Sequence, residues 1–301
     1  MRHNAEEILQ QLQAAGYRAA FLPISAMAQV NEHYDTLLAR GPDTLWLRNG
    51  VGHFRRSQPP KLDFEPRSIL VTAYPGVGGK LVLHRGGGVI EIPIPPNCVT
   101  VTPPERWIEN ILPAIAQGWQ LGPVKGISTK LLAALSGLGQ YGRNNICYVG
   151  DWGSYTGLYA CYTDIPHEGP VFTDLRMAVC DTCGLCREAC PTGAIGEHQV
   201  IDASRCLPHV NNGRKGPMPR WVPKAAHHTL IECLRCQACC PQNPPADFSH
   251  TLELDGAETK QLLSRAKKMP ENLAQKFQEF GMGGWSMQAV KRNARLFAKA
   301  K

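Results

Sequence analysis

The sequence predicts a mixed α+β protein built from an amino-terminal α/β domain, a cysteine-rich module and a short helical segment. Short β-rich runs alternate with amphipathic helical patterns in the first half of the chain. Nine of the twelve cysteines then lie between Cys180 and Cys240, and helical patterns without cysteine follow. We therefore expect three parts, at residues 1–168, 169–250 and 251–301.

Length, charge and hydropathy narrow the class of protein. A chain of 301 residues is long enough for one large domain or two ordinary ones. Its formal net charge of +7 suits an acidic redox partner, a nucleic acid or a phosphate-bearing cofactor equally. Acidic residues occupy the start of the chain, where a signal peptide needs an apolar run, and no apolar stretch of about 18 residues occurs. We expect a cytoplasmic protein with no membrane partner.

The amino-terminal part shows the signals of two helices and a strand. A helix is expected over residues 4–15, because Asn4 can cap it and Glu7 lies three residues later. A second helix is expected over residues 25–40, before a Gly-Pro pair ends it. The β-rich residues 68–73 predict a short buried strand.

A hairpin and a further helix are expected next. Residues 80–84 and 89–94 flank Arg85-Gly-Gly-Gly88, which predicts two strands joined by a turn. Three glycines also occur in phosphate-binding loops, but no helix with a Lys-Ser/Thr pair follows, which favours the turn. Thr102, with a glutamate three residues later, predicts the capped start of a helix that continues to Ile115.

A glycine-rich segment, Gly137-Leu-Gly-Gln-Tyr-Gly142-Arg-Asn144, follows a helical pattern at residues 130–136. Its three glycines either bring backbone amides close to a flat or anionic ligand or make a tight turn. It lacks the preceding strand of a dinucleotide-binding loop. Residues 146–149 and 157–162 predict strands. Three cysteines in apolar surroundings are expected to be buried structural thiols: Cys98, Cys147 and Cys161.

The first cysteine run has the spacing of a module that binds two [4Fe–4S] clusters. It reads Cys180-x2-Cys183-x2-Cys186-x3-Cys190-Pro191. Two intervening residues let neighbouring thiolates bind one cluster, and the longer step before Cys190 directs that sulfur to a second cluster.

The second run completes this pattern. It reads Cys233-x2-Cys236-x3-Cys240-Pro241 and lacks one sulfur, which the upstream Cys206 can supply. The crossover rule of two-cluster ferredoxins then divides the ligands into two sets. One cluster is assigned to Cys180, Cys183, Cys186 and Cys240, and the other to Cys190, Cys206, Cys233 and Cys236. Cys239 is left over, and Cys240 is favoured over it because Cys240 has the matching spacing and the following proline.

Zinc and disulfides are the alternative explanations for these cysteines. Zinc sites use separated Cys-x2-Cys pairs that close on one tetrahedron, and they have no use for a fourth thiolate three residues beyond three others. Disulfides need an oxidising compartment, and no export signal is visible. Iron–sulfur clusters fit the spacing better than either.

Three helices are expected after the second run. The first is capped by Asp255 with Glu258 three residues later, the second starts at Pro270 and the third at Ser286. Basic residues in the last turns suit the negative end of a helix dipole.

The glycine-rich segment and the cysteine runs together resemble the epoxyqueuosine reductase family, relatives of the reductive dehalogenases. Besides Gly137 to Asn144, the similar segments are Gly153-Ser154, Thr163-Asp164, Cys190-Pro-Thr-Gly-Ala-Ile195, Ile201-Asp-Ala-Ser-Arg-Cys206 and Cys240-Pro-Gln-Asn243. The resemblance covers residues 120–245 well and the amino-terminal part loosely. The joint occurrence of the glycine segment with the cysteine runs is its specific feature.

This resemblance implies a nitroreductase-like α/β domain that binds cobalamin, followed by a ferredoxin-like module whose two clusters pass single electrons to the corrinoid. It implies a low-potential donor of the ferredoxin or flavodoxin type and a small-molecule substrate, and tRNA is a further partner in the tRNA-modifying members. By the same resemblance, the residues that would lie against the corrin are Gly137, Leu138, Gly139, Gly142, Asn144, Gly153 and Ser154.

The chain departs from the family at two places. An aspartate proposed as the proton donor of the tRNA-modifying reductases is missing upstream of the glycine segment, where this chain reads Leu121-Gly-Pro-Val-Lys125-Gly. We also expect the chain to lack the C-terminal helical repeat domain of some members. We therefore expect a divergent paralogue, in which Lys125 or Tyr141 delivers the proton.

The leading hypothesis is an iron–sulfur oxidoreductase that relays electrons through two clusters to a bound cobalamin for reduction of an organic substrate. The alternative is an electron-transfer or activator protein that reduces a separate corrinoid protein or redox enzyme and has no substrate of its own. A third possibility, an RNA-binding protein with structural clusters, rests on the basic loop between Cys206 and Cys233 and on the basic C-terminal turns.

Overall fold

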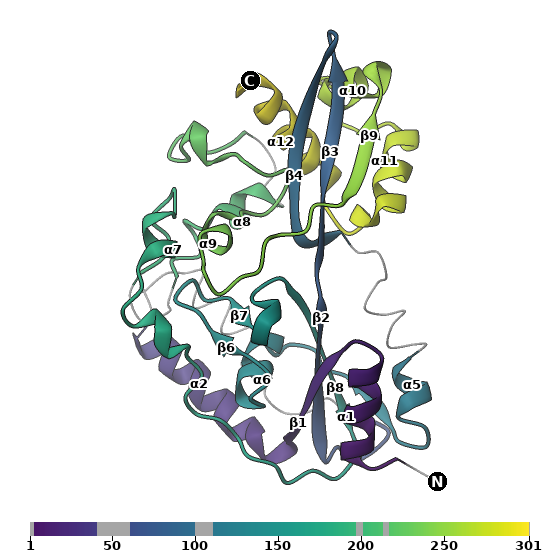
Figure 1. The fold of residues 1–301 in the computed structure, drawn as a ribbon, viewed down its shortest axis with the longest axis vertical. Helices are drawn as coiled ribbons and strands as arrows, with labels where there is room; N and C mark the ends of the chain where they lie inside the picture. Colours follow the sequence, from purple (N-terminus) through teal and green to yellow (C-terminus); the bar gives the residue numbers. More distant parts are fainter. Residues whose placement is uncertain (1–2, 41–60, 100–110, 197–200, 213–216, 301) are drawn as a thin grey trace. The chain divides into compact units, whose positions relative to one another are not determined.

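The computed structural model describes residues 3–40, 61–99, 111–196, 201–212 and 217–300 (Figure 1). Contacts divide the chain into two compact units, and each unit is assembled from stretches that are separate in sequence. The first unit contains residues 1–75, 103–183 and 196–202, and the second contains residues 76–102, 184–195 and 203–301.

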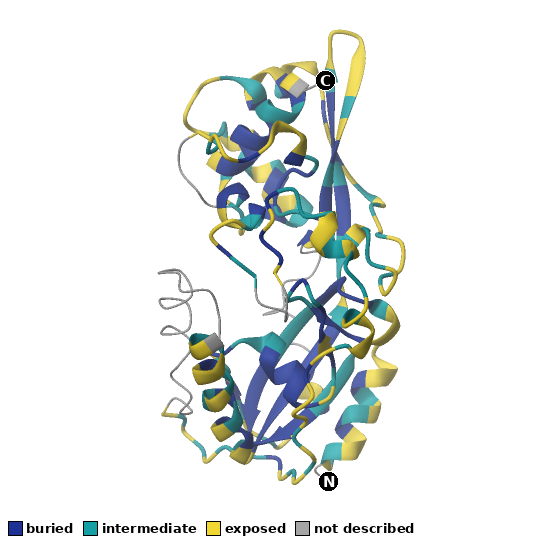
Figure 2. Ribbon diagram, turned by 90° about the vertical axis from the view of Figure 1, so that its left-hand side faces the viewer, coloured by how far each residue is buried: buried dark blue, intermediate teal, exposed yellow. Residues whose placement is uncertain are grey.

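The first unit is built on a four-stranded antiparallel sheet in the order β1-β2-β8-β5. Strands β2 (Ser68–Pro75) and β8 (Thr156–Thr163) confirm two of the predicted strands, and they pair along their whole length. Strands β1 (Arg18–Pro23) and β5 (Leu121–Pro123) complete the sheet and were not predicted. Figure 2 shows the central strands of this sheet coloured as buried.

Helices pack against both faces of this sheet. Successive side chains of a strand point to opposite faces, so one strand contributes to a core on each side. On one face α1 (Ala5–Ala14) packs with Leu70 of β2, and Asn4 forms the predicted capping box with Glu7. On the other face α2 (Met27–Arg40) and α6 (Thr129–Leu135) form a second core with the neighbouring residues of β2.

The second unit contains a hairpin extended by a third strand. Strands β3 (Val77–Arg85) and β4 (Gly88–Val99) confirm the predicted hairpin. Strand β9 (His250–Leu254) pairs with β3 in parallel, as Figure 1 shows. This strand was not predicted, and it ends directly before the cap of the first predicted C-terminal helix.

Three helices cover this smaller sheet and confirm the predicted C-terminal helices: α10 (Gly256–Leu263), α11 (Glu271–Phe277) and α12 (Met287–Ala300). The predicted capping box of Asp255 and Glu258 is present at the start of α10. Leu81 of β3 and Phe277 of α11 are fully buried in the core between sheet and helices.

The remaining elements are short. The predicted start of a helix at Thr102 lies outside the described residues, and a short helix, α5 (Leu112–Ile115), occupies the last part of the predicted range. No helix among the described residues is long and apolar enough to cross a membrane. The other short elements are η1 (Ile24–Ala26), β6 (Gln140–Tyr141), β7 (Cys147–Tyr148), η2 (Gly150–Trp152), η3 (Ala178–Cys180), α7 (Leu185–Glu188), α8 (Leu207–Asn211), η4 (Lys224–Ala226), α9 (Arg235–Ala238) and η5 (Gln278–Met282).

Candidate metal centre

Several cysteine thiols of the second unit lie close together. Helix α7, which precedes Cys190, packs against α9, which contains Cys236. Burial raises the pKa of the Cys236 thiol, and four neighbouring thiols raise it further. Like charges disfavour ionisation when they are near one another, so these thiols lie near enough to Cys236 to interact electrostatically. The four neighbours are Cys233, Cys206, Cys186 and Cys190.

Hydrogen-bond donors point at the sulfur of Cys190. The Ala194 amide nitrogen lies 3.3 Å from Cys190 Sγ, and Thr192 Oγ1 lies 3.6 Å from it. Burial raises the pKa of this thiol, but hydrogen bonds from Thr192, Ala194 and Ile195 outweigh burial and lower it overall. These donors therefore favour the thiolate, which is the form that binds a metal.

Two asparagines at the end of α8 fix the residue before Cys233. Asn212 Nδ2 donates to Glu232 Oε1 at 2.5 Å, and Asn212 Oδ1 accepts from the Glu232 amide at 2.7 Å. Asn211 Nδ2 donates to the Glu232 carbonyl at 2.8 Å. Glu232 has φ 57°, a conformation that non-glycine residues rarely adopt. The asparagines thus stabilise an unusual backbone beside Cys233 and tie it to the helix that follows Cys206.

Helix α12 anchors the same two segments. Arg292 Nη2 donates to the carbonyls of Val210 at 2.8 Å and Asn211 at 2.9 Å. Asn293 Nδ2 donates to the carbonyls of Asn211 at 2.9 Å and Leu230 at 2.8 Å. Both side chains are buried, so these bonds are shielded from water. Hydrogen bonds from the C-terminal helix therefore link the backbone near Cys206 to the backbone near Cys233.

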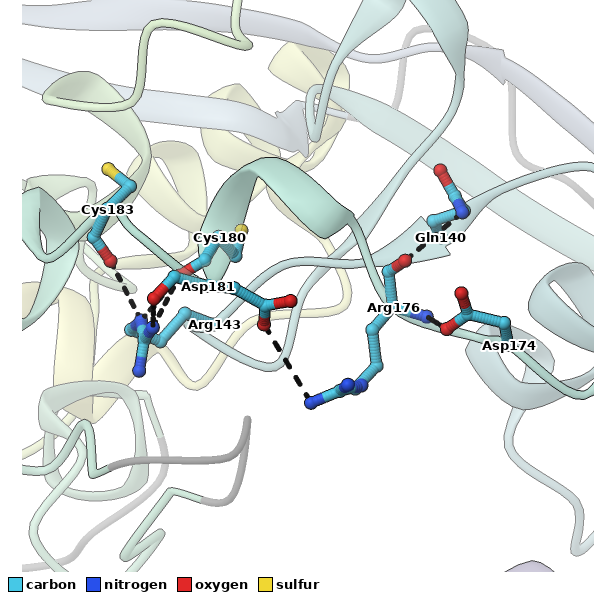
Figure 3. Close-up of polar contacts among 7 residues, drawn as sticks. All are labelled: Gln140, Arg143, Asp174, Arg176, Cys180, Asp181 and Cys183. Atoms are coloured by element: carbon cyan, nitrogen blue, oxygen red, sulfur yellow. Dashed lines mark hydrogen bonds and ion pairs between the residues drawn. The ribbon is translucent and has the colours of Figure 1, made fainter.

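Cys180 and Cys183 lie at the end of the 103–183 stretch of the first unit, where one arginine contacts their backbone (Figure 3). Arg143 Nε donates to the Cys183 carbonyl at 2.9 Å and to the Cys180 carbonyl at 3.2 Å. Its Nη2 donates to the Cys180 carbonyl as well and to the Asp181 carbonyl at 3.3 Å. A single guanidinium thus contacts the loop that contains both cysteines.

The chain reaches this loop by pairing with the glycine-rich segment. The Tyr141 amide donates to the Leu175 carbonyl at 2.7 Å, and the Met177 amide donates to the Tyr141 carbonyl at 3.0 Å. Gln140 Nε2 donates to the Arg176 carbonyl at 3.2 Å, as Figure 3 shows. Hydrogen bonds therefore join the segment before the first cysteine run and the glycine-rich segment into one layer.

The boundary between the two units falls inside the first cysteine run. Cys180 and Cys183 belong to the first unit, and Cys186 and Cys240 belong to the second. The assignment of these four to one cluster, and of the other four to the second cluster, stays a prediction. The choice of Cys240 over Cys239 also stays a prediction.

The donor set suits iron–sulfur clusters in its chemistry. The nine cysteines from Cys180 to Cys240 all have intermediate exposure. Iron would offset the mutual repulsion of thiolates around Cys236, and amides aimed at sulfur are a common feature of cluster sites. Among the described residues, no group of three or more His, Cys, Asp or Glu side chains is placed to hold a single metal ion.

The glycines of the glycine-rich segment contact other parts of the chain. A Cβ added at any of the three would meet protein atoms at 2.5–2.6 Å rather than open space. The contacts join Gly137 to the Phe172 ring, Gly139 to Cys147 Sγ and Gly142 to the Tyr148 ring. Packing within the chain is thus sufficient reason for these glycines.

The other residues predicted to lie against a corrin also have roles within the chain. Asn144 is buried and donates to the Tyr148 hydroxyl at 2.9 Å. Gly153 has φ 60° in a turn, Ser154 beside it is buried, and Leu138 is half-buried against the main core. Their placement against a corrin therefore rests on the family resemblance.

The two predicted proton donors have different environments. Lys125 is exposed. Tyr141 is buried, and its ring stacks on His33 with the ring centroids 6.4 Å apart. Burial raises the pKa of the Tyr141 hydroxyl far above its usual value, so the hydroxyl stays protonated. Their role in proton delivery stays a prediction.

Arg143, Arg292 and Asn293 were not among the predicted site residues. Asn293 lies three and four residues from the buried Val290 and Ala289, which places it on the apolar face of α12. That position is a signal that its amide is buried. For Arg143 the sequence offers only its place in a glycine-rich turn.

A comparison with protein families identifies the module. Residues 179–243 match the family described as 4Fe-4S double cluster binding domain. This range contains both cysteine runs and Cys206. The prediction of a two-cluster [4Fe–4S] module is therefore confirmed.

The chain is also similar to curated relatives and solved structures of epoxyqueuosine reductases. The chain is 34% identical over 146 residues to an epoxyqueuosine reductase from Gloeobacter violaceus, covering 47% of this chain and 44% of that protein. The match thus spans less than half the length of that curated relative. A crystal structure of selenomethionine-labelled epoxyqueuosine reductase has a TM-score of 0.67 at 21% identity, covering 97% of this chain and 80% of that one.

A structure of epoxyqueuosine reductase with an epoxyqueuosine-modified tRNA stem loop has a TM-score of 0.64 at 20% identity, with the same coverage of 97% and 80%. The predicted resemblance to epoxyqueuosine reductases and the predicted mixed α+β fold are both confirmed.

Proposed function

We propose that this chain is an iron–sulfur reductase that uses two [4Fe–4S] clusters and a bound cobalamin to reduce an organic substrate. The observation that carries the proposal is the grouping of thiols around Cys236, with hydrogen-bond donors aimed at the Cys190 sulfur. The match of residues 179–243 supports the identity of the clusters. The similarity to epoxyqueuosine reductases supports the reaction class.

The clusters supply single electrons at low potential, and the cobalamin supplies the metal centre at which the substrate is reduced. The chain's own residues would hold these groups and control their surroundings. Donors from Thr192 and Ala194 would stabilise the Cys190 thiolate, and burial around Cys236 would keep water from the second cluster. The corrin would lie at Gly137–Asn144 and at Gly153 with Ser154, as the resemblance implies.

Anaerobic reconstitution tests the proposal. We expect the chain, supplied with iron and sulfide, to bind about eight irons in two clusters. After incubation with cobalamin and removal of the excess, corrin absorbance should co-elute with the protein and change when a low-potential reductant is added. A colourless preparation that holds zinc would overturn the cluster assignment. Two clusters without retained corrin would overturn the cobalamin part alone.

The electron-transfer alternative has specific observations in its favour. The glycines of the glycine-rich segment already contact Phe172, Cys147 and Tyr148, and residues 121–126 contain no carboxylate to donate a proton. In this alternative the chain would take electrons from a ferredoxin or flavodoxin and pass them to a separate corrinoid protein. It predicts reduction of an added corrinoid protein by a chain that retains no corrin itself.

The first substrate to test is epoxyqueuosine in a tRNA stem loop, because a similar fold was solved with that ligand. Turnover should depend on whichever residue delivers the proton. We expect Lys125→Gln or Tyr141→Phe to reduce turnover at least tenfold while leaving the iron content unchanged. Full turnover in the double variant would remove both residues as donors.

A further inference from the structure

Arg143 has an unusual set of partners. Its guanidinium donates only to backbone carbonyls, those of Cys180, Asp181 and Cys183, with the Cys183 bond at 2.9 Å (Figure 3). Among the described residues, no carboxylate lies within ion-pair distance of it. Its positive charge is therefore not neutralised by a neighbouring acid, and it lies against the backbone of two predicted ligands of one cluster.

The turn that presents Arg143 is held firmly. Between β6 and β7 the Gly142 amide donates to the Ile146 carbonyl at 2.9 Å, and the Asn145 amide donates to the Gly142 carbonyl at 2.9 Å. Lys130 Nζ donates to the Asn145 carbonyl at 2.8 Å. These hydrogen bonds fix the backbone of the turn from which the Arg143 side chain extends. The guanidinium is thus aimed at the loop by the fold of the first unit.

Arg176 provides an internal comparison. It lies on the same layer, and its Nη1 is 3.9 Å from the Asp181 carboxylate, with both side chains about half exposed (49% and 57%). Its guanidinium has a carboxylate partner, and among the described residues it donates to no cysteine carbonyl. The two arginines near this loop therefore differ in one respect. Arg143 contacts the backbone of the predicted cysteine ligands directly, and Arg176 contacts a carboxylate side chain instead.

We infer that Arg143 is a positioning residue for the cluster bound by Cys180 and Cys183, and that its charge raises the reduction potential of that cluster above the value it would otherwise have. This inference rests on the proposed function in one respect, namely that the cysteine runs bind two clusters. Reduction adds a negative charge to a cluster, so a nearby cation stabilises the reduced state. The hydrogen bonds to the ligand backbone keep that cation close.

The test compares three variants of the full chain with its clusters loaded, in the absence of corrinoid and substrate. Arg143→Gln removes the charge and most of the donors. Arg143→Lys keeps the charge but replaces the planar five-donor group with one ammonium. Arg176→Gln is the matched control, because it removes the same charge from the same layer. Each cluster's midpoint potential is measured by redox titration with electron paramagnetic resonance.

We expect Arg143→Gln to make the potential of one cluster more negative. At a fixed potential its ratio of reduced to oxidised cluster should fall about tenfold, equivalent to about 59 mV for one electron. The other cluster and the Arg176→Gln control should change less than about threefold. Arg143→Lys should restore most of the potential, while hydrogen exchange of the Cys180 and Asp181 amides becomes faster, because the loop is held by fewer bonds.

The outcomes separate this inference from the proposed function. A wild-type chain that binds no clusters would refute both. Two clusters in the wild type, with unchanged potentials in Arg143→Gln or an equal shift in Arg176→Gln, would overturn the inference alone. If Arg143→Gln loses one cluster and keeps the other, so that iron falls from about eight to about four per chain, positioning is supported. Equal loss of both clusters overturns it.

Discussion

The two cysteine regions of this chain are held by side chains that donate to backbone carbonyls but differ in burial. The loop of Cys180 and Cys183 is held by the half-buried guanidinium of Arg143, which donates to backbone carbonyls. The backbone near Cys206 and Cys233 is held by Arg292 and Asn293, which are 8% and 2% exposed.

This difference indicates what a mutation should change in each region. A half-buried cation near the ligand backbone acts on the charge of the site, and losing it mainly alters redox behaviour. Buried amide and guanidinium groups donate to carbonyls that are shielded from water, and losing these bonds costs stability. Mutations in the first region should therefore mainly change the reduction potential of the cluster. Mutations in the second region should mainly lower the folding stability.

The largest expected effect is the loss of a ligand in the second region. Cys236→Ser should lose one cluster, so that iron falls from about eight to about four per chain, because a hydroxyl is a poor substitute for a thiolate on iron. Cys239→Ser is the matched control at the residue that follows the same helix, and this variant should keep all of its iron. Metal analysis of anaerobically purified protein decides this. Full iron content in Cys236→Ser would contradict the ligand assignment.

The next largest effect concerns the buried hydrogen bonds of Asn293. Asn293→Ala removes two hydrogen bonds to buried carbonyls and should lower the free energy of unfolding by about 2 kcal/mol. Gln288→Ala, an exposed change on the same helix, should alter it by less than about 0.5 kcal/mol. Urea denaturation of the anaerobic, cluster-loaded protein gives the comparison. Equal stabilities of the two variants would show that α12 does not fasten the second region.

The smallest effect concerns the thiols outside both regions. Burial raises the pKa of Cys147 and Cys161 to about 12 and also raises that of Cys98, so all three stay neutral and unreactive at pH 8. Iodoacetamide should therefore modify Cys239 first in the folded, cluster-loaded chain, and mass spectrometry identifies the site. Denaturant should make the three buried thiols react.

The same pKa shifts set a pH dependence with a definite sign. A thiol whose pKa is raised by folding contributes its full stability below the unfolded value of about 8.5. That contribution is lost as the pH rises from there toward the folded value.

Modification of Cys161 in the folded chain before Cys239 would contradict the assignment of these buried thiols as structural.

Local sequence signals determined much of this protein. The capping boxes at Asn4 and Asp255, the hairpin around residues 85–88 and the two-cluster spacing all depend on residues a few positions apart. Such short-range patterns can be recognised in the sequence, because the physical interactions involved span only one turn, one hairpin or one loop.

Only the tertiary structure decided the rest. The parallel pairing of β9 with β3 joins residues 79–83 to residues 250–254, and the contacts of Arg143 and Asn293 join segments that are distant in sequence. A polar side chain emerging from a turn or a helix has no periodicity that names its partner. Its partner is set by which backbone carbonyls the packed chain leaves within reach, and packing depends on the whole fold.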